Sequence, residues 1–75
     1  MNNIKKLIPC KCCGANYIEE SGNYEICPNC FWEDDGISDE DTYSNVNHLT
    51  LKEAKENYRK FKACSIEFVK HVNKN

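Results

Sequence analysis

The chain of 75 residues lacks a long run of apolar residues. A secretory signal needs about 7 to 15 apolar residues in a row, and a membrane-spanning helix needs about 20. Between Met1 and Pro9 the apolar residues are Ile4, Leu7 and Ile8, and lysines interrupt them. We therefore expect a soluble, cytoplasmic protein whose thiols stay reduced.

The residue arrangements typical of an enzyme are absent as well. The sequence shows no Ser/His/Asp or Cys/His pattern, no phosphate-binding loop and no internal repeat. Its length indicates a single domain, residues 1–75, whose apolar core is small enough to need a covalent or metal staple. We predict a non-enzymatic domain, and the cysteines are the candidates for its staple.

Five of the six cysteines lie within the stretch "CKCCGANYIEESGNYEICPNC". Cys10 and Cys13 form one C-x-x-C pair, and Cys27 and Cys30 form a second. Two residues between ligands let a tight turn direct both sulfurs at one ion, and two such turns suit tetrahedral zinc. We predict that these four cysteines hold a structural Zn²⁺ ion, with iron and disulfides as the alternatives. Four thiolates would close the coordination shell, which leaves no position for a substrate.

The segments around the cysteines predict the fold. The runs "ANYIEE" and "NYEIC" have strand composition, and the turn residues 21–23 separate them. A hairpin that joins two metal-binding turns is a zinc ribbon. We therefore predict a small, metal-stapled α+β domain, with a zinc ribbon and acidic loop over residues 8–36 and a helical part over residues 49–72.

The two remaining cysteines allow several interpretations. Cys12 lies between Cys10 and Cys13 and could substitute for either as a ligand. It could be a spare thiol that faces out of the turn, or a redox or metal sensor if a nearby cation lowers its pKa. Cys64 follows Ala63 in an apolar stretch, where a small buried residue is expected.

The helical part predicts one long and one short helix. Thr50 and Glu53 have the spacing of a capping box, in which each side chain bonds the other residue's backbone. The long helix then has an apolar face that packs on the ribbon. The short helix covers about residues 65–72.

Charge is unevenly distributed along the chain. Residues 1–45 carry three lysines against nine acids, a balance of −6, whereas residues 46–75 carry a balance of +4. The long helix has a basic stripe made of Lys52, Lys55, Arg59 and Lys62. This stripe is a solvated face or, as an alternative function, a nucleic-acid-binding ridge. Four thiolates and one Zn²⁺ would bring the net charge to about −4, which weakens the nucleic-acid hypothesis.

An acidic loop follows the second cysteine pair. It does not fit a calcium loop, because Phe31 stands where the first ligand belongs. It is either a solvated loop or a docking surface for a basic protein. The candidate partner-binding residues are Trp32, Glu33, Asp34, Asp35, Asp39, Glu40 and Asp41. We predict a protein-interaction module that uses this surface, and an immunity-like inhibitor would be one concrete form.

Three stretches of the sequence resemble the bacterial cysteine-rich CPCC family. They are "CKCCG" at Cys10, "YEICPNCFWEDDG" at Tyr24 and "NHLTLKEAKENYRKF" at Asn47. The resemblance covers roughly residues 8–72 and implies a small ribbon-like domain. This chain has Lys11 where the family usually has proline, and the metal-binding turn can form without it. The resemblance implies little about function.

Overall fold

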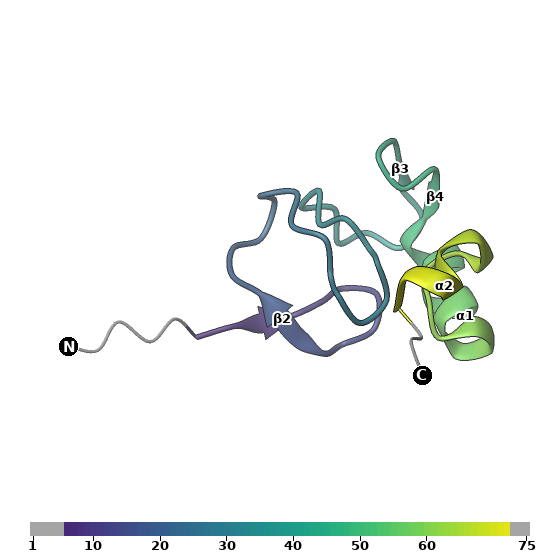
Figure 1. Cartoon of the computed structure of the whole chain (residues 1–75). Helices are drawn as coiled ribbons and strands as arrows, with labels where there is room; N and C mark the ends of the chain where they lie inside the picture. Colours follow the sequence, from purple (N-terminus) through teal and green to yellow (C-terminus); the bar gives the residue numbers. More distant parts are fainter. Residues whose placement is uncertain (1–5, 73–75) are drawn as a thin grey trace.

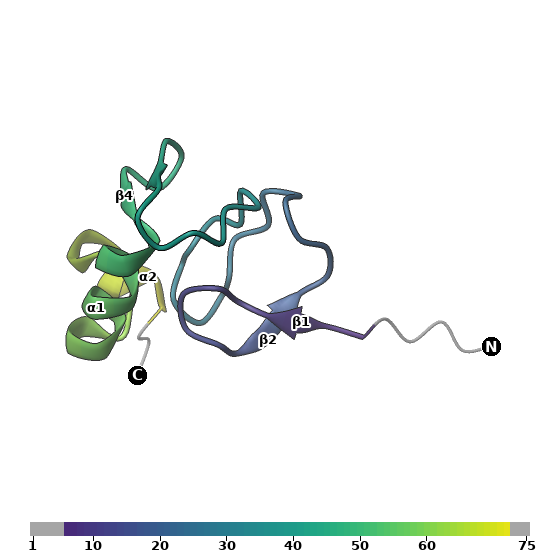
Figure 2. The same ribbon diagram turned by 180° about the vertical axis from the view of Figure 1, so that it is seen from behind.

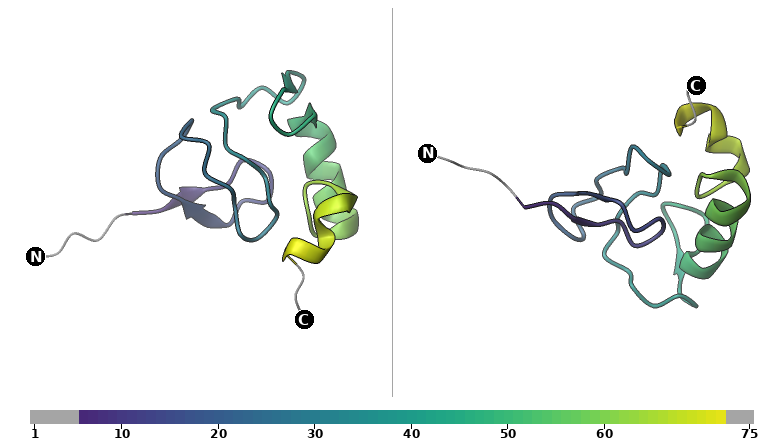
Figure 3. Two further views of the ribbon diagram at one scale, coloured as in Figure 1. Left: turned by 45° about the horizontal axis from the view of Figure 1, so that its top comes forward. Right: turned by 90° about the horizontal axis from the view of Figure 1, so that it is seen from below.

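The computed structural model describes residues 6–72. They form a ribbon part (residues 8–36), with a first cysteine turn at residues 10–13 and a second at residues 27–30, and a helical part (residues 49–72). The helices lie together on one side of the ribbon part (Figures 1 and 3). Two short antiparallel sheets and two helices confirm the predicted α+β class. No helix within this range is long and apolar enough to cross a membrane.

The first cysteine turn is closed by its own strands. Strand β1 (Ile8–Pro9) pairs with β2 (Asn16–Ile18), so that Ile8 faces Ile18, and Figure 2 shows the two strands side by side. The predicted hairpin between "ANYIEE" and "NYEIC" is therefore wrong. Strand β2 already has a partner, and the Glu25 carboxylate accepts hydrogen bonds from the N–H groups of Glu19 and Glu20.

The second cysteine turn is closed in the same way. Ile26 forms a β-bridge with Glu33, flanked by hydrogen bonds from Cys27 N to Trp32 O (2.9 Å) and from Asp34 N to Glu25 O (2.9 Å). Each turn thus lies at the end of its own small antiparallel arm. A C-x-x-C turn reverses the chain, and the residues on either side of it are brought into pairing distance.

The long helix begins as its sequence predicts. Strand β3 (Tyr43–Ser44) pairs with β4 (Leu49–Thr50), and α1 (Leu51–Phe61) follows immediately. Thr50 Oγ1 accepts from Glu53 N (3.1 Å), and the Glu53 carboxylate accepts from Thr50 N (2.9 Å). Both bonds of the predicted capping box are present. The helix begins at Leu51, later than the start of the predicted helical part at residue 49, because residues 49 and 50 pair as a strand.

The C-terminal part is less helical than predicted. Helix α1 ends at Phe61, and its C-cap residue Lys62 adopts a left-handed conformation with φ of 65°. A 3₁₀ turn, η1 (Ile66–Phe68), then leads into the single turn of α2 (Val69–Val72). The N–H of Cys64 donates to the carbonyl of Cys30 (2.8 Å) and ties this segment to the second cysteine turn.

The core lies where the ribbon part meets α1. Ile18 and Trp32 from the ribbon part and Leu51 and Ala54 from α1 are almost fully buried among cysteine side chains. Tyr58 and Phe68 are half-buried and pack against this core. Cysteine sulfurs thus supply much of the interior, as expected for a chain too short to bury many large side chains.

Candidate metal centre

The four cysteines selected from the sequence come together. The Sγ atoms of Cys10, Cys13, Cys27 and Cys30 all lie within 4.8 Å of one another. Sγ of Cys10 lies 3.6 Å from that of Cys30, and Sγ of Cys13 lies 3.8 Å from that of Cys27. A tetrahedron with metal–sulfur bonds of about 2.3 Å has edges of about 3.8 Å. The separations of 3.6 and 3.8 Å match such an edge, and the others are at most 4.8 Å, so the four sulfurs are close enough together to hold one tetrahedral ion.

Both cysteine turns direct backbone N–H groups at the sulfurs. Cys12 N lies 3.4 Å from the sulfur of Cys10, and Asn29 N lies 3.4 Å from the sulfur of Cys27. In each turn the donor follows the first cysteine by two residues, so the C-x-x-C spacing itself creates the contact. These donors stabilise the thiolate relative to the thiol, and the thiolate is the form that binds a metal.

The residues that follow the two turns share an unusual conformation. Gly14 has φ of 83°, and Phe31 at the corresponding position of the second turn has φ of 72°. Glycine adopts this left-handed region freely, but a bulky residue is strained there by about 1–2 kcal/mol. Phe31 stacks on His71 (5.0 Å between ring centroids) and contacts Phe68 (4.7 Å). These contacts with the C-terminal segment offset the strain.

Asn29 is a residue at the site that sequence reasoning missed. Its side-chain amide donates to the sulfur of Cys13 (3.3 Å) and to the hydroxyl of Tyr58 on α1 (3.1 Å). It therefore links the sulfur cluster to the long helix. A polar residue between the cysteines of "CPNC" is the signal that could have found it, because hydrogen bonds from neighbouring residues orient metal ligands.

The crowded sulfurs titrate unequally. Hydrogen bonds from Cys10 and Cys30 lower the pKa of Cys27. The hydrogen bond with Cys27 raises the pKa of Cys10, and the bond with Cys10 raises that of Cys30. The cluster therefore accepts one negative charge readily and resists the next, because like charges would lie about 4 Å apart. A divalent cation at the centre would remove that resistance.

The described residues fit a metal ion better than disulfides. All six cysteines are free, and three of the four clustered ones are buried. Four thiolates satisfy a tetrahedral ion completely, so the centre suits a structural ion rather than a catalytic one. The ion would draw together two turns that are 14 or more residues apart.

A family model described as cysteine-rich CPCC matches residues 8–75 of this chain. The chain belongs to this family. The resemblance seen in the sequence is thereby confirmed. No curated protein matches the chain.

Two cysteines of this CPCC domain lie outside the four-sulfur cluster. Cys12 is buried, and its thiol donates to the carbonyl of Ala54 on α1 (3.4 Å). Its sulfur therefore contacts the helix, and the prediction of a thiol that faces out of the turn is wrong. Cys64 is fully buried, as predicted, and burial raises its pKa to about 12. Both thiols act in packing between the cysteine turns and the helical part.

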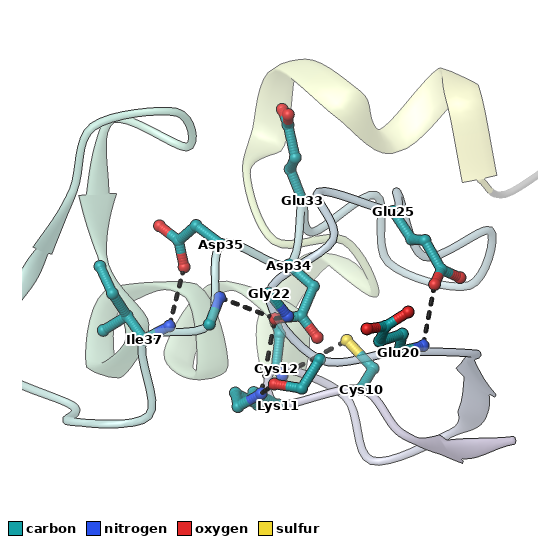
Figure 4. Close-up of polar contacts among 12 residues, drawn as sticks. Cys10, Lys11, Cys12, Glu20, Gly22, Glu25, Glu33, Asp34, Asp35 and Ile37 are labelled. Atoms are coloured by element: carbon teal, nitrogen blue, oxygen red, sulfur yellow. Dashed lines mark hydrogen bonds and ion pairs between the residues drawn. The ribbon is translucent and has the colours of Figure 1, made fainter.

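The structure corrects the proposed partner surface at two positions. Trp32 and Asp34 are both 0% exposed, so neither is available to a partner. On the extended arm alternate residues point inward, and Trp32 and Asp34 share the inward face. Asp34 Oδ1 accepts from Gly36 N (3.0 Å), from Gly22 N (3.4 Å) and from the ammonium of Lys11 (3.4 Å) (Figure 4). Its carboxylate thus fixes the loop instead of binding a partner.

The other acidic candidates differ in what they offer. Asp39 and Asp41 are exposed, and the hydroxyl of Thr42 lowers the pKa of Asp39. Glu40 pairs with Lys55 of the basic stripe, while Asp35 accepts hydrogen bonds from Ser44 and from the N–H of Ile37. Glu33 is half-buried, and Figure 4 shows its side chain pointing away from Asp34. The exposed acidic surface is thus smaller than the sequence predicted.

The basic stripe is present but partly occupied. Lys52 and Arg59 are exposed on α1. Lys55 pairs with Glu40, and the ammonium of Lys62 lies 5.7 Å from the centre of the Tyr58 ring. A ridge with one of its four cations paired to a carboxylate attracts phosphate less strongly than the sequence suggested.

Proposed function

We propose that this CPCC domain holds a structural Zn²⁺ ion and acts as a non-enzymatic protein-interaction module. The observation that carries the zinc proposal is the cluster of four sulfurs within 4.8 Å of one another, with N–H donors at two of them. Thiolates are soft ligands, and a four-sulfur set selects zinc or iron over calcium and magnesium. The ion stabilises the fold, so the function lies on the surface.

The surface proposal rests on charge. Residues 1–45 carry an excess of six negative charges, and Asp39 and Asp41 are exposed acids on either side of Glu40, which pairs with Lys55 of α1. A surface of this kind favours a basic protein by electrostatic steering and complementarity. An immunity-like inhibitor of a basic toxin is one form that such a module could take.

The metal proposal is tested by expressing the chain and measuring bound metals by elemental analysis. We expect one zinc per chain and, after exchange with cobalt, the absorption of a tetrahedral thiolate complex. The variant Cys13→Ser should lose that absorption pattern, whereas Cys64→Ala should keep it. A colourless cobalt form, or one iron per chain, would refute structural zinc.

The partner proposal is tested by capture from a lysate of the native host, with nuclease treatment. We expect a basic protein that is retained by the zinc-loaded chain and lost with Asp39→Lys and Asp41→Lys together. The matched control is Glu56→Lys, which reverses one exposed charge on α1. Equal capture by the loop variant and the control would contradict the proposal.

A further inference from the structure

The arm of the second cysteine turn is paired on one edge and open on the other. The bonds that flank the bridge between Ile26 and Glu33 leave the N–H and C=O groups of both residues directed away from the arm. On the Glu33 side, the Asn47 amide donates to Glu33 O (2.9 Å) and accepts from Glu33 N (2.9 Å). A side chain there takes the place of a neighbouring strand.

The opposite edge has no such cover among residues 6–72. The N–H and C=O of Ile26 have no hydrogen-bond partner in this range, and Ile26 is 48% exposed. Pro28, two residues after Ile26, has no backbone N–H group. An unpaired strand edge beside an exposed apolar side chain is the feature that peptide segments use when they add as a strand.

Tyr24 adds a second apolar group near this edge. It is 56% exposed although its φ is 58°, a conformation that is unfavourable for a bulky residue. Phe31, with a similar φ, packs on the C-terminal rings, but Tyr24 has no ring contact of this kind among the described residues. Internal packing therefore does not explain why a tyrosine stands here.

The charges around the edge determine which occupant fits. Residues 6–36 contain six acids against two lysines. Lys11 bonds to Asp34 and Ser21, so it does not neutralise Glu33, which lies opposite Ile26, or Glu25, which precedes it. A second copy of this chain would bring like charges together across an edge-to-edge contact. A segment with apolar residues flanked by Lys or Arg would be attracted.

We infer that the Ile26 edge binds an extended, basic segment of a partner protein by strand addition. The inference deepens the proposed function and rests on it, since the partner is the same basic protein and the edge is a second contact besides the acidic loop. Two backbone hydrogen bonds to Ile26 align the segment. Apolar residues then contact Ile26 and Tyr24, and cations lie near Glu25 and Glu33.

The test uses the zinc-loaded full chain and a seven-residue peptide of alternating lysine and valine. We expect the peptide to shift the amide signal of Ile26 in NMR spectra and to slow its hydrogen exchange at least tenfold. A peptide of the same sequence with N-methylated valines cannot donate these bonds, and it should bind at least tenfold more weakly. Equal binding of the two peptides would overturn strand addition.

Two protein variants complete the test. Ile26→Pro removes an N–H that points outward, which edge strands tolerate, so it should keep the cobalt spectrum and lose the peptide. Tyr24→Asn removes the ring at a position where asparagine tolerates the positive φ. It should weaken peptide binding severalfold without lowering the unfolding midpoint. Unchanged binding by both variants would overturn the inference.

The outcomes separate the edge from the acidic loop. If the peptide shifts only signals of residues 39–41, the acidic loop binds basic chains and the edge inference is wrong. If the peptide does not bind at all, the edge inference is also wrong. In either case, capture of a partner that depends on Asp39 and Asp41 would still support the proposed function.

Discussion

Asn29 contacts both the sulfur cluster and the long helix through one amide group. Its bond to the sulfur of Cys13 stabilises a thiolate, and its bond to the hydroxyl of Tyr58 holds the amide in place. Single residues of this kind commonly contribute 10- to 100-fold to metal affinity. The effect of Asn29 can be separated into these two bonds by substitution.

We expect Asn29→Ala to lower zinc affinity by about 10-fold or more, because the Cys13 thiolate loses a donor. Competition with a chromophoric chelator at neutral pH measures this change. Tyr58→Phe is the matched control, since it removes the hydroxyl but leaves the bond to sulfur intact. A similar loss in both variants would show that Asn29 acts through the helix and not through the ligand.

The cysteines and their C-x-x-C spacing were enough to predict the four-sulfur cluster, because this spacing determines which sulfurs one turn can bring together. The sequence could not show which residues of "FWEDD" point into the core. Alternation places Trp32 and Asp34 on one face, but nothing local says that this face is the buried one. The packing of α1 and the loop at Gly22 decides it, and these contacts are distant in sequence.

At the scale of elements, helix α1 follows its local signals and the ribbon strands do not. The capping box needs only Thr50 and Glu53, which are three residues apart, so the sequence predicts it directly. The strands have two or three residues each, which is too few for a clear pattern. Each cysteine turn reverses the chain and so determines which segments pair, and that is why the expected hairpin does not form.

We predict that Thr50→Ala lowers the free energy of unfolding by about 1 kcal/mol, because Glu53 N loses its acceptor at the start of the helix. Thermal or urea unfolding of the zinc-loaded chain measures the difference. Thr50→Ser keeps the hydroxyl and should behave like the parent chain. Bound zinc should stay at the same stoichiometry in both variants. An equal loss in the serine variant would point to the methyl group instead of the cap.

At the scale of the whole molecule, the sulfur cluster brings the two cysteine turns together inside the core that packs against α1. The ribbon arms are short, and large apolar side chains in the core are few. In small domains of this kind the free energy of metal binding is largely the free energy of folding. Cys64 N and Phe31 connect the C-terminal segment to the same centre, so loss of the proposed ion would affect both parts.

We therefore expect a strong chelator to unfold the chain, including α1, which contributes no ligand. Circular dichroism should show loss of helix signal as zinc leaves, and readdition of zinc under reducing conditions should restore it. Cys64→Ala serves as a control that lacks a thiol but keeps all four ligands. Retention of the full helix signal without zinc would show that the apolar core suffices.

The backbone hydrogen bond from Cys64 to Cys30 also bears on how the protein is made, because it joins a late part of the chain to an early one. All four clustered cysteines lie within the first 30 residues, whereas Tyr58, Cys64 and Phe68, which pack around them, come much later. On a ribosome the sulfurs therefore emerge well before their cover, since synthesis proceeds from the N-terminus. If the centre takes up the proposed ion at this stage, the ion reaches the nascent cysteine turns from open solvent, and the helical part closes over a centre that is already loaded.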